Sequence, residues 1–241
     1  MEHELWAAAL LNQFLPGVAT WIQSLAGVKV EDPSHPWANW AAMEIVVTLI
    51  ILVLFPVLRA RLSVDRPGRF QQTFELVYEF LRDQADENHV VRFLPYFGTV
   101  FIFVLFSNLL GIIPSLESPT MYAVVPCGVA VCTFLVYHIA GVREHGLGKY
   151  LLHFVGPFPW LAPLMIPIEL ISHCARPLSL TVRLYGNMFA GEQVTLAFIG
   201  LTYLVFPAAS MALHVFVSFL QAYIFALLSM IYISSAVAHE D

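Results

Sequence analysis

The sequence has few charged residues for its length. Among 241 residues there are 11 Lys plus Arg and 17 Asp plus Glu, so only 12% of the chain is charged. Soluble domains are typically about 25% charged and about 45–50% apolar, whereas 59% of this chain is hydrophobic. The shortage of charge therefore excludes most soluble enzyme folds and predicts a membrane protein.

Several functional signals are also missing. The net charge of −6 provides no basic surface for nucleic acid, and the chain has no glycine-rich phosphate loop and no HExxH or CxxC motif. We therefore predict no nucleic-acid partner, no cofactor and no metal site. Cys127, Cys132 and Cys174 lie in apolar runs, which favours buried, unpaired thiols over a disulfide or a metal site.

Long apolar runs are abundant, and they predict the fold. A bilayer core about 30 Å thick needs roughly 20 apolar residues in a helix. We predict five transmembrane helices, at about 41–58, 96–113, 123–140, 161–203 and 208–237. The predicted class is an all-α membrane protein in which residues 41–241 form one membrane domain. The odd number of spans and the absence of an internal repeat argue against an inverted-repeat transporter.

The fourth predicted span is too long for a simple crossing. As one helix, residues 161–203 would be about 60 Å long at about 1.5 Å per residue, roughly twice the bilayer core. This segment must therefore tilt steeply, bend near Pro177, or break. We expect it to lie antiparallel to the last span, through a connection near Phe206 and Pro207, so that the last two spans form a long, tilted pair.

Positive charge is concentrated in two of the loops between spans. The loop after the first span holds six arginines, and the loop after the third holds Arg143 and Lys149, whereas residues 114–122 contain neither Lys nor Arg. Because positively charged loops stay in the cytoplasm, we expect an outer N-terminus and a cytoplasmic C-terminus. Three histidines flank the second basic loop and are expected to be solvated: His138, His145 and His153.

Two further segments are amphipathic. Residues 1–40 lack the positive start of a signal peptide and contain four tryptophans, which predicts an interfacial segment on the outer face. In the first basic loop, apolar residues recur at helical spacing, at Phe70, Phe74, Val77 and Leu81. This spacing predicts an amphipathic helix on the cytoplasmic membrane surface, with a partner-docking face as the alternative.

Four charged residues inside the fourth span indicate a function. A charged side chain at the middle of a bilayer costs about 2.5 to 3.5 kcal/mol on insertion scales. The four are Glu169, Arg176, Arg183 and Glu192. On a helical wheel, the first three share an arc of about 120° with four polar residues, Ser172, His173, Ser179 and Asn187. Such a stripe faces protein or water rather than lipid, and Glu192 falls on a different face.

Simpler interpretations of these residues remain open at this point. Arg176 and Arg183 are each compatible with a static ion pair to one of the acids, and His173 with a satisfied interior histidine. Glu44, near the start of its span, fits an interfacial position as well as a channel mouth. Serines in membrane helices often bond to a backbone carbonyl one turn earlier, which is our expectation for Ser179, Ser218 and Ser235.

The last span has a polar stripe of its own. It comprises His214, Ser218, Gln221, Tyr232 and Ser235. Antiparallel pairing of the last two spans places the Glu192 end of one beside the His214 end of the other. Histidine titrates near neutral pH, and burial favours the protonated form of a carboxyl group. Glu192, His214 and Gln221 therefore predict a proton relay.

Four segments resemble one known family. The run from Arg176 to Glu192, RPLSLTVRLYGNMFAGE, resembles the a subunit of F-type ATP synthases. Three other runs resemble the signatures of this family in the same order: SNLLGIIP at 107–114, IPIELIS at 166–172 and HVFVSFLQAYIFALLSMIY at 214–232. The resemblance extends from about Phe70 to the C-terminus and is strongest after Pro167.

The resemblance implies a function, a location and partners. A member of this family is a non-catalytic stator subunit in the cell inner membrane, and forms two proton half-channels against a rotating ring of carboxyl-bearing subunits, the c-ring. It couples proton translocation to ATP synthesis. The implied partners are the c-ring, the peripheral-stalk b subunits, the rest of the ATP synthase and the lipid bilayer.

The resemblance also implies roles for individual residues. Arg183 matches the essential arginine of the family, a gating cation that faces the ring carboxyl. The half-channel for proton uptake from outside would contain Glu192, His214, Gln221 and Asn187. The half-channel for proton release to the cytoplasm would contain Glu169, Ser172, Arg176 and Tyr232.

One segment departs from the pattern of the family. Family members often have Asp or Asn followed by Thr after the Pro-Thr of the second hairpin, whereas Pro119-Thr120 here leads into Met121. We therefore expect Asn108 and Glu44 to help supply the outer path. Two other functions compete: a stand-alone proton-coupled secondary transporter, and a metal-dependent intramembrane enzyme that uses Glu192 and His214.

Overall fold

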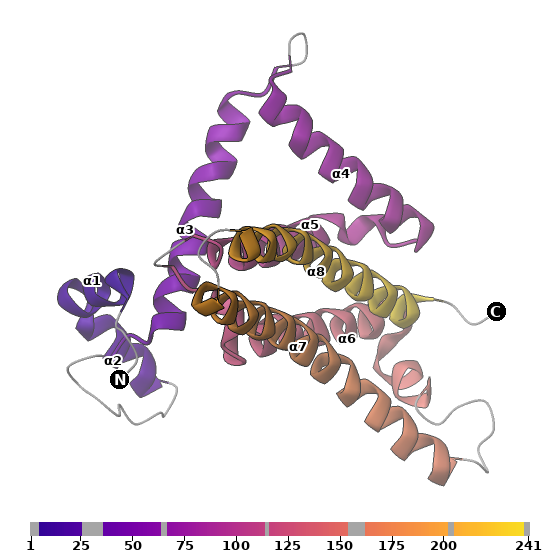
Figure 1. Ribbon diagram of the computed structural model, residues 1–241. Helices are drawn as coiled ribbons and strands as arrows, with labels where there is room; N and C mark the ends of the chain where they lie inside the picture. Colours follow the sequence, from indigo (N-terminus) through magenta and orange to yellow (C-terminus); the bar gives the residue numbers. More distant parts are fainter. Residues whose placement is uncertain are drawn as a thin grey trace.

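The chain is helical throughout the part that the structure describes. A computed structural model describes residues 5–25, 36–63, 67–113, 116–153, 162–201 and 205–238 (Figure 1). Its α-helices are α1 (Trp6–Phe14), α2 (Pro16–Leu25), α3 (Asn39–Ala60), α4 (Arg69–Glu87), α5 (Leu94–Leu110), α6 (Val124–His153), α7 (Ala162–Leu201) and α8 (Val205–Val237). Two 3₁₀ turns, η1 (Val91–Phe93) and η2 (Pro119–Met121), complete the fold. The predicted all-α class is confirmed.

Four stretches of helix are long and apolar enough to cross a membrane. They are Asn39–Ala60, Val91–Leu110, Val124–Gly148 and Pro207–Val237, and they correspond to the first, second, third and fifth predicted spans. Within the described residues, α7 is not among them, because its charged and other polar side chains lower its mean hydropathy. The prediction of a multi-pass membrane protein is thus confirmed for four spans.

Helix α7 corresponds to the fourth predicted span and has 40 residues. It continues as one helix through Pro167 and Pro177, so a break in this segment is excluded. Membrane helices tolerate proline where neighbouring helices and local adjustments satisfy the freed backbone groups, and here α6 and α8 both pack against α7. Residues 161, 202 and 203 of the predicted span, and residue 204 of the connection to α8, lie outside the described residues.

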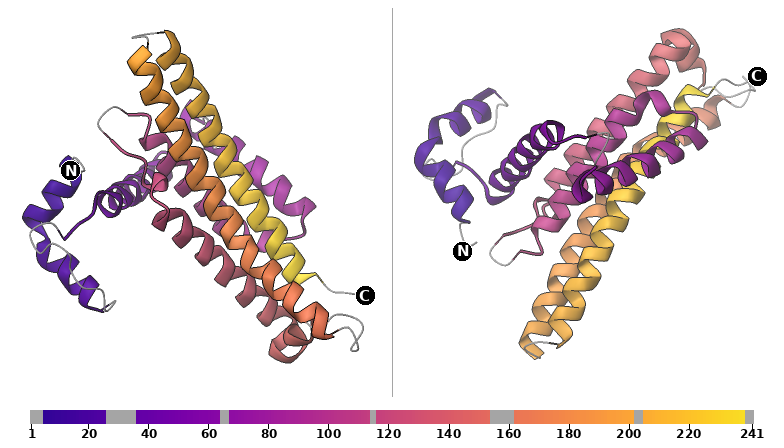
Figure 2. Two further views of the ribbon diagram at one scale, coloured as in Figure 1. Left: turned by 60° about the horizontal axis from the view of Figure 1, so that its bottom comes forward. Right: turned by 90° about the horizontal axis from the view of Figure 1, so that it is seen from above.

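Helices α5 to α8 form the core of the molecule. Helices α7 and α8 run side by side over most of their lengths (Figures 1 and 2). Helix α5 packs on α8, and α6 packs on both α7 and α8. Small residues, Ala222 and Ala226, are fully buried on α8 and allow its neighbours to approach closely. This packing supports the long helix pair that carries most of the polar residues singled out above.

The predicted amphipathic helix is confirmed as α4, and only part of it is docked. Leu81 and Ala85 are buried against the bundle, and the Tyr223 hydroxyl donates to Gln84 Oε1 at 3.3 Å. By contrast, Phe70 and Leu76 are 60% and 68% exposed. The C-terminal half of α4 is therefore bound to α8, while its N-terminal half diverges from the bundle together with the end of α3 (Figure 1).

The N-terminal segment contains two short helices beside α3. Ala7 and Ala8 of α1 are buried in one cluster with Ala42 and Met43 of α3. The Trp37 indole donates to the Leu15 carbonyl at 2.9 Å. These contacts attach the segment to the first span, away from the α7–α8 pair (Figure 2).

The prediction of buried cysteines is wrong for all three. Cys127, Cys132 and Cys174 are free thiols on the exposed surface of the chain. Their faces of α6 and α7 are not covered by other helices of this chain. In a membrane protein, apolar positions of this kind meet lipid or another subunit, so a hydrophobic sequence context does not require burial within the chain itself.

Candidate functional site

The antiparallel contact between α7 and α8 positions the polar residues. The hydroxyls of Thr195 and Ser210 are hydrogen-bonded at 2.8 Å. One turn further along, Gly191 lies against the imidazole of His214, so closely that a β-carbon on Gly191 would be 3.2 Å from the ring. The step from Thr195 back to Gly191 on α7 thus matches the step from Ser210 forward to His214 on α8, as expected for antiparallel helices. The predicted position of the Glu192 end beside the His214 end is confirmed.

The same register can be followed to the other end of the pair. It brings Gln221 to the level of Arg183 and Tyr232 to the level of His173. A direct contact supports it, because the Arg176 guanidinium lies 5.1 Å from the centre of the Tyr232 ring. The polar residues therefore form one group around Glu192 and another around Glu169, with Arg183 between them; we name these the outer and the inner group after the orientation predicted from the sequence.

Arg183 lies at the border between the buried and the uncovered face of α7. Its neighbours Leu180 and Leu184 are buried in the core, whereas Ser179 is exposed. The guanidinium donates to Ser179 Oγ at 3.4 Å. Among the described residues, no carboxylate forms an ion pair with it, so the static ion pair is not found there. Ser179 accepts from Arg183 rather than bonding to a carbonyl one turn earlier.

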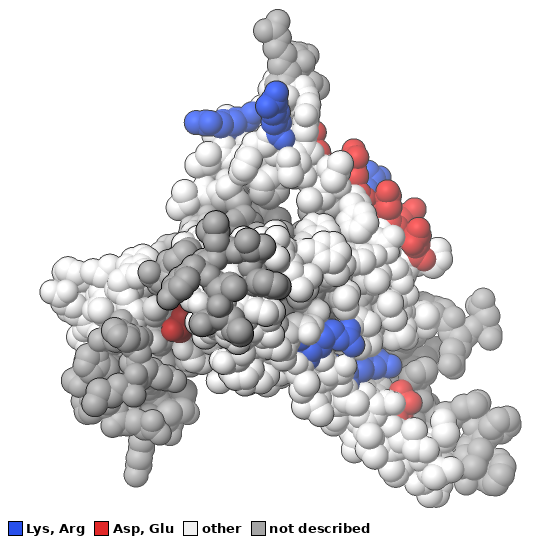
Figure 3. All heavy atoms as spheres, in the orientation of Figure 1, with Lys and Arg blue, Asp and Glu red and all other residues white. Residues whose placement is uncertain are grey.

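The uncovered face of α7 is apolar apart from its few charges. Exposed residues along it include Ile171, Leu178, Val182, Phe189 and Val194. Figure 3 shows basic groups over α7, with an acidic group beside them farther along the helix, on a surface that is uncharged around them. An isolated cation on an apolar helix face is costly in a bilayer. This face is therefore suited to contact another protein that carries a compensating acid.

At the outer end, Glu192 has an acidic neighbour that sequence reasoning missed. Its half-buried carboxylate interacts electrostatically with that of Glu117. Glu117 in turn accepts a hydrogen bond from the Tyr122 hydroxyl at 2.7 Å. In the sequence, the only sign of this role was that Glu117 is an acid in a loop, residues 114–122, that contains no Lys or Arg. The loop folds onto α7, because η2 contacts that helix.

The imidazole of His214 is half-buried between the helices. Its Nε2 atom is buried and makes no hydrogen bond to any described residue. Ser218, one turn away and fully buried, donates to the His214 carbonyl at 2.7 Å. Ser235 likewise donates to a backbone carbonyl, that of Tyr232 at 2.9 Å, so the expectation for these two serines is confirmed in kind. Gln221 is also buried, at 8% exposure.

A buried polar network lies between α5 and the hairpin loop. The Thr120 hydroxyl donates to Asn108 Oδ1 at 2.6 Å, and the Ser118 hydroxyl donates to the Ser107 carbonyl at 2.9 Å. Gly111 permits this approach, since a β-carbon there would be 2.8 Å from that of Ser118. Asn108 Nδ2 and Ser107 Oγ bond to no described residue. Buried polar atoms of this kind are usually satisfied by water, so the network suits a hydrated path.

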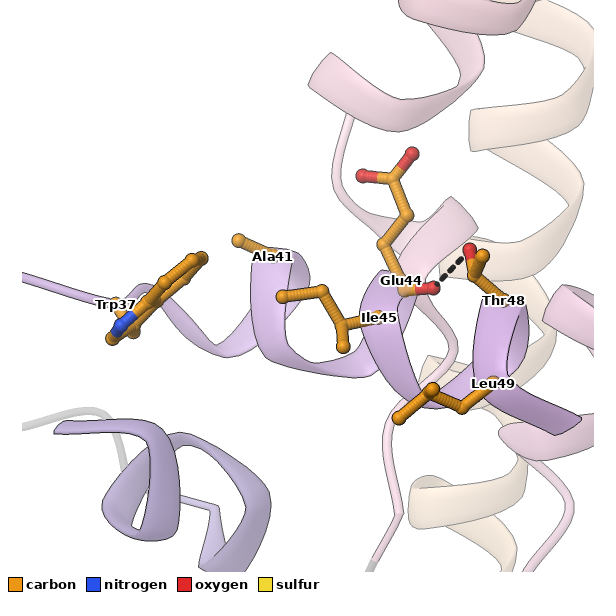
Figure 4. A pocket seen from close by; sticks show the side chains of 6 residues that line it. All are labelled: Trp37, Ala41, Glu44, Ile45, Thr48 and Leu49. Atoms are coloured by element: carbon orange, nitrogen blue, oxygen red, sulfur yellow. Dashed lines mark hydrogen bonds between the residues drawn. The ribbon is translucent and has the colours of Figure 1, made fainter. Parts of the chain in front are cut away.

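Glu44 lies at the same end of the bundle, on α3. It lines a hollow of about 420 Å³ together with Trp37, Ala41, Ile45, Thr48 and Leu49 (Figure 4). Thr48 donates to the Glu44 backbone carbonyl at 2.9 Å, while the carboxylate extends away from this bond (Figure 4). Because α3 also contacts η2, Glu44 is close to the loop that carries Glu117.

At the inner end, Arg176 lies among aromatic rings. Its guanidinium is 5.6 Å from the Tyr137 ring centre and 5.1 Å from that of Tyr232. Cation–π contacts of this kind contribute about 0.5–2 kcal/mol, depending on desolvation. Glu169 lies close to His173 instead, at 3.2 Å between Oε1 and Nε2. The static ion pair that the sequence left open for Arg176 is not found among the described residues, where Arg176 contacts aromatic rings instead.

The expectation of a solvated His138 is wrong. Its ring is half-buried and stacked on the His173 ring, with the centroids 5.3 Å apart. His138 Nδ1 is hydrogen-bonded to the Tyr150 hydroxyl at 2.6 Å. His145 is intermediate in exposure, and the side chain of His153 lies outside the described residues. Within the described residues, no three His, Cys, Asp or Glu side chains are placed to hold a metal ion.

Comparison with known proteins identifies the family. The model of the family "ATP synthase A chain" matches residues 41–234. The chain belongs to this family. "ATP synthase subunit a" of Solibacter usitatus (strain Ellin6076) is 56% identical over 234 residues, which cover 96% of this chain and 100% of the relative. "ATP synthase subunit a" of Koribacter versatilis (strain Ellin345) is 44% identical over 242 residues, 99% of each chain.

Membership of the ATP synthase A chain family confirms the resemblance drawn from the sequence motifs. The chain is a component of the ATP synthase membrane sector and serves as the stator of its proton channel. A stand-alone proton-coupled transporter is not favoured. The family match begins near the start of α3 and ends three residues before the end of α8. It therefore includes both polar groups of the site.

Proposed function

We propose that this stator subunit forms two proton half-channels that meet at Arg183, on a face of α7 that contacts the rotating c-ring. The observation that carries the proposal is the position of Arg183. It lies between two separate polar groups, and no described carboxylate pairs with it. The subunit itself catalyses no reaction and works together with the c-ring and the peripheral-stalk b subunits.

The positive charge of Arg183 would act on each ring carboxyl as it arrives. A guanidinium stays charged in proteins, and a cation nearby favours the ionised form of a carboxyl group. The proton of that carboxyl then leaves toward the inner group. The same charge repels a proton that would cross directly between the half-channels. Each elementary charge that crosses 100 mV yields about 2.3 kcal/mol, so several together can drive rotation and ATP synthesis.

The outer half-channel would supply the proton that the ring takes up. Its proposed residues are Glu117, Glu192, His214, Asn187 and Gln221, with Asn108 on the neighbouring helix. Glu44 and Glu117 would collect protons at the mouth. Since Gln221 reaches the level of Arg183 in the register of α7 and α8, this path ends beside the gating cation, where a carboxylate must be neutralised before it enters lipid.

The inner half-channel would release the proton to the cytoplasm. Its proposed residues are Glu169, Ser172, Arg176 and Tyr232. At this end of the bundle, Arg92 of η1 forms a 2.6 Å ion pair with Glu144, which follows Arg143 in α6. Basic residues of this kind favour a cytoplasmic location.

The orientation of the chain follows from the same reasoning. We propose α7 as a fifth, tilted span in the cell inner membrane, residues 41–241 as one membrane domain, and residues 1–40 as an interfacial segment on the outer face. Helix α4 would then lie at the cytoplasmic surface, and the C-terminus would be cytoplasmic.

Purification in mild detergent tests the proposed partners. We expect the chain to co-purify with a ring of small subunits that each carry one membrane carboxyl, together with the stalk subunits. The matched control is the same preparation after dissociation of the complex, which should release the ring. A monomer that transports solute in liposomes would instead establish the transporter.

Loss of a titrating group at the outer end should weaken proton uptake. We expect Glu192→Gln and His214→Ala each to lower ATP synthesis in membrane vesicles several-fold, because general acid–base groups contribute about 10² to 10⁴-fold where they act alone. The defect should shrink as the pH on the outer side falls, since water then delivers protons faster. ATP synthesis measured between pH 6 and 8.5 checks this.

The exposed neighbour Gln193 provides the control for these variants. Gln193→Ala should leave the rate and its pH profile unchanged. If Glu192→Gln and His214→Ala both kept the parent profile, neither residue would belong to the uptake path.

A further inference from the structure

A cluster of aromatic and titratable side chains joins α6, α7 and α8 at the inner end. The Tyr137 hydroxyl is hydrogen-bonded to His173 Nδ1, and His173 Nε2 lies 3.2 Å from Glu169 Oε1. His173 is buried, at 6% exposure, and Tyr137 at 1%. The imidazole is thus hydrogen-bonded to a hydroxyl at Nδ1, and a carboxylate lies within ion-pair distance of Nε2.

Two glycines build this cluster. Gly146 has φ of +76°, a conformation that favours glycine, and there α6 changes direction. The following turn places Tyr150 against Gly141, where a β-carbon would come within 2.5 Å of the tyrosine ring. Tyr150 is therefore buried and can bond to His138, whose ring covers one side of His173.

We propose that His173 is a proton carrier of the inner half-channel, held in position by Tyr137 and discharging to Glu169. The inference rests on the proposed two half-channels and adds to them a residue outside the polar set assigned above. A satisfied interior histidine needs one partner at each nitrogen. Here the group that faces Nε2 is a titratable carboxylate at ion-pair distance, 28% exposed at its side chain, on the proposed path.

The proposed step moves one proton and changes only N–H and O–H bonds. His173 donates its Nδ1 proton to the Tyr137 oxygen and keeps this bond throughout, which fixes the tautomer. During ATP synthesis, His173 Nε2 accepts a proton that comes from the c-ring, and the imidazole becomes an imidazolium. The same Nε2 proton then passes to the Glu169 carboxylate and on to water. The imidazole of His173 returns to its starting tautomer. During ATP-driven pumping, the step runs in reverse.

The charges around His173 suit a carrier that holds its proton only briefly. The titratable and charged groups that surround it are Glu169, Arg176 and Cys174 on α7, Tyr137, His138 and Tyr150 on α6, and Tyr232 on α8. Arg176 opposes a second positive charge, whereas Glu169 favours it. His138, stacked on the same ring, cannot become charged at the same time without repulsion. Glu169 and Arg176 thus act on the imidazolium in opposite directions.

ATP-driven proton pumping by the complete ATP synthase in inverted membrane vesicles tests this role. The cytoplasmic side of such vesicles faces the medium, so its pH and composition can be set directly. We expect His173→Gln to lower pumping by about 10-fold and to flatten its dependence on external pH between 6 and 8. Tyr137→Phe, which keeps the ring packing, should lower pumping less and shift the same profile.

Chemical rescue separates a carrier from a structural residue. In His173→Ala, imidazole added to the medium should restore pumping several-fold, and it should have no effect on the parent enzyme. His145→Gln, a histidine of α6 outside the cluster, is the control and should keep the parent rate. An assembled His173→Gln enzyme with the parent rate and profile would overturn the proposal, as would a His173→Ala defect that imidazole does not relieve.

Failure of the relay and failure of the half-channel proposal give different results. If Arg183→Ala blocks pumping while His173→Gln is normal, the half-channels stand and only the relay is wrong. If Arg183→Ala pumps normally, the half-channel proposal itself fails.

Discussion

Replacement of Arg183 by alanine is expected to abolish both ATP-driven proton pumping and proton-driven ATP synthesis, while the complex still assembles. A unit charge about 4 Å from a carboxylate contributes about 4 kcal/mol at an effective dielectric constant of about 20. That energy corresponds to a change of about 10³-fold in rate. Without it, a ring carboxyl would keep its proton as it passes α7, and the two half-channels would no longer be separated.

Assembly should survive because Arg183 contributes little to the fold of the chain. Its one side-chain bond to a described residue is the long contact to Ser179, at 3.4 Å. The packing beneath it comes from Leu180 and Leu184, which the variant retains. Pumping and synthesis in vesicles, together with the subunit composition of the purified complex, measure the two parts of the prediction.

Two control variants sharpen the Arg183 experiment. Arg59→Ala removes an exposed arginine from the last turn of α3, far from the site in sequence, and should have no effect on coupling. Arg183→Lys keeps the charge but loses the planar guanidinium fork, so it should retain at most a small part of the activity. Normal ATP synthesis by an assembled Arg183→Ala enzyme would contradict the role of Arg183 as the gate.

The spans were predictable because one physical quantity decides them. A run of about 20 apolar residues without charge has few alternatives to a membrane helix, and α3, α5, α6 and α8 follow such runs. The continuity of α7 was less predictable, since Pro167 and Pro177 make a bend or a break equally plausible from the sequence. In the structure, α6 and α8 pack against α7 and the helix continues through both prolines.

The central part of the site was also predictable, for a geometric reason. The helical period places Arg183 on the same stripe as Glu169, and antiparallel pairing brings Glu192 to His214. Both relations depend only on regular helix geometry. The roles proposed for these residues remain to be tested by the variants described above.

The peripheral part of the site was not predictable from periodicity. A folded loop brings Glu117 close enough to Glu192 for an electrostatic interaction, and the change of direction at Gly146 brings Tyr150 to His138. In both cases a non-helical segment sets the contact, so neither spacing nor hydropathy indicates it. The wrong expectations of a solvated His138 and of buried cysteines have a related cause, since burial depends on which helix faces this chain itself covers.

Replacement of Gly191 by leucine is expected to lower ATP-driven pumping by about 10²-fold, which makes it the second largest effect. Even a β-carbon at this position would lie 3.2 Å from the His214 ring. A leucine side chain must push α7 and α8 apart, and overpacking of this kind typically costs about 1–3 kcal/mol. A displacement of about 1 Å from the working geometry typically costs on the order of 10²-fold in rate. The separation would move His214 away from Glu192 and interrupt the outer path.

A graded series distinguishes this steric effect from a general loss of glycine. Gly191→Ala needs the imidazole to move by only a few tenths of an ångström and should lower pumping much less than leucine does. Gly128→Leu places the same side chain on α6 where a β-carbon meets nothing within 4 Å, and it should leave pumping unchanged. Equal defects in the alanine and leucine variants would mean that close packing is not what Gly191 provides. Normal pumping in Gly191→Leu would mean that α7 and α8 do not meet at His214 in the working enzyme.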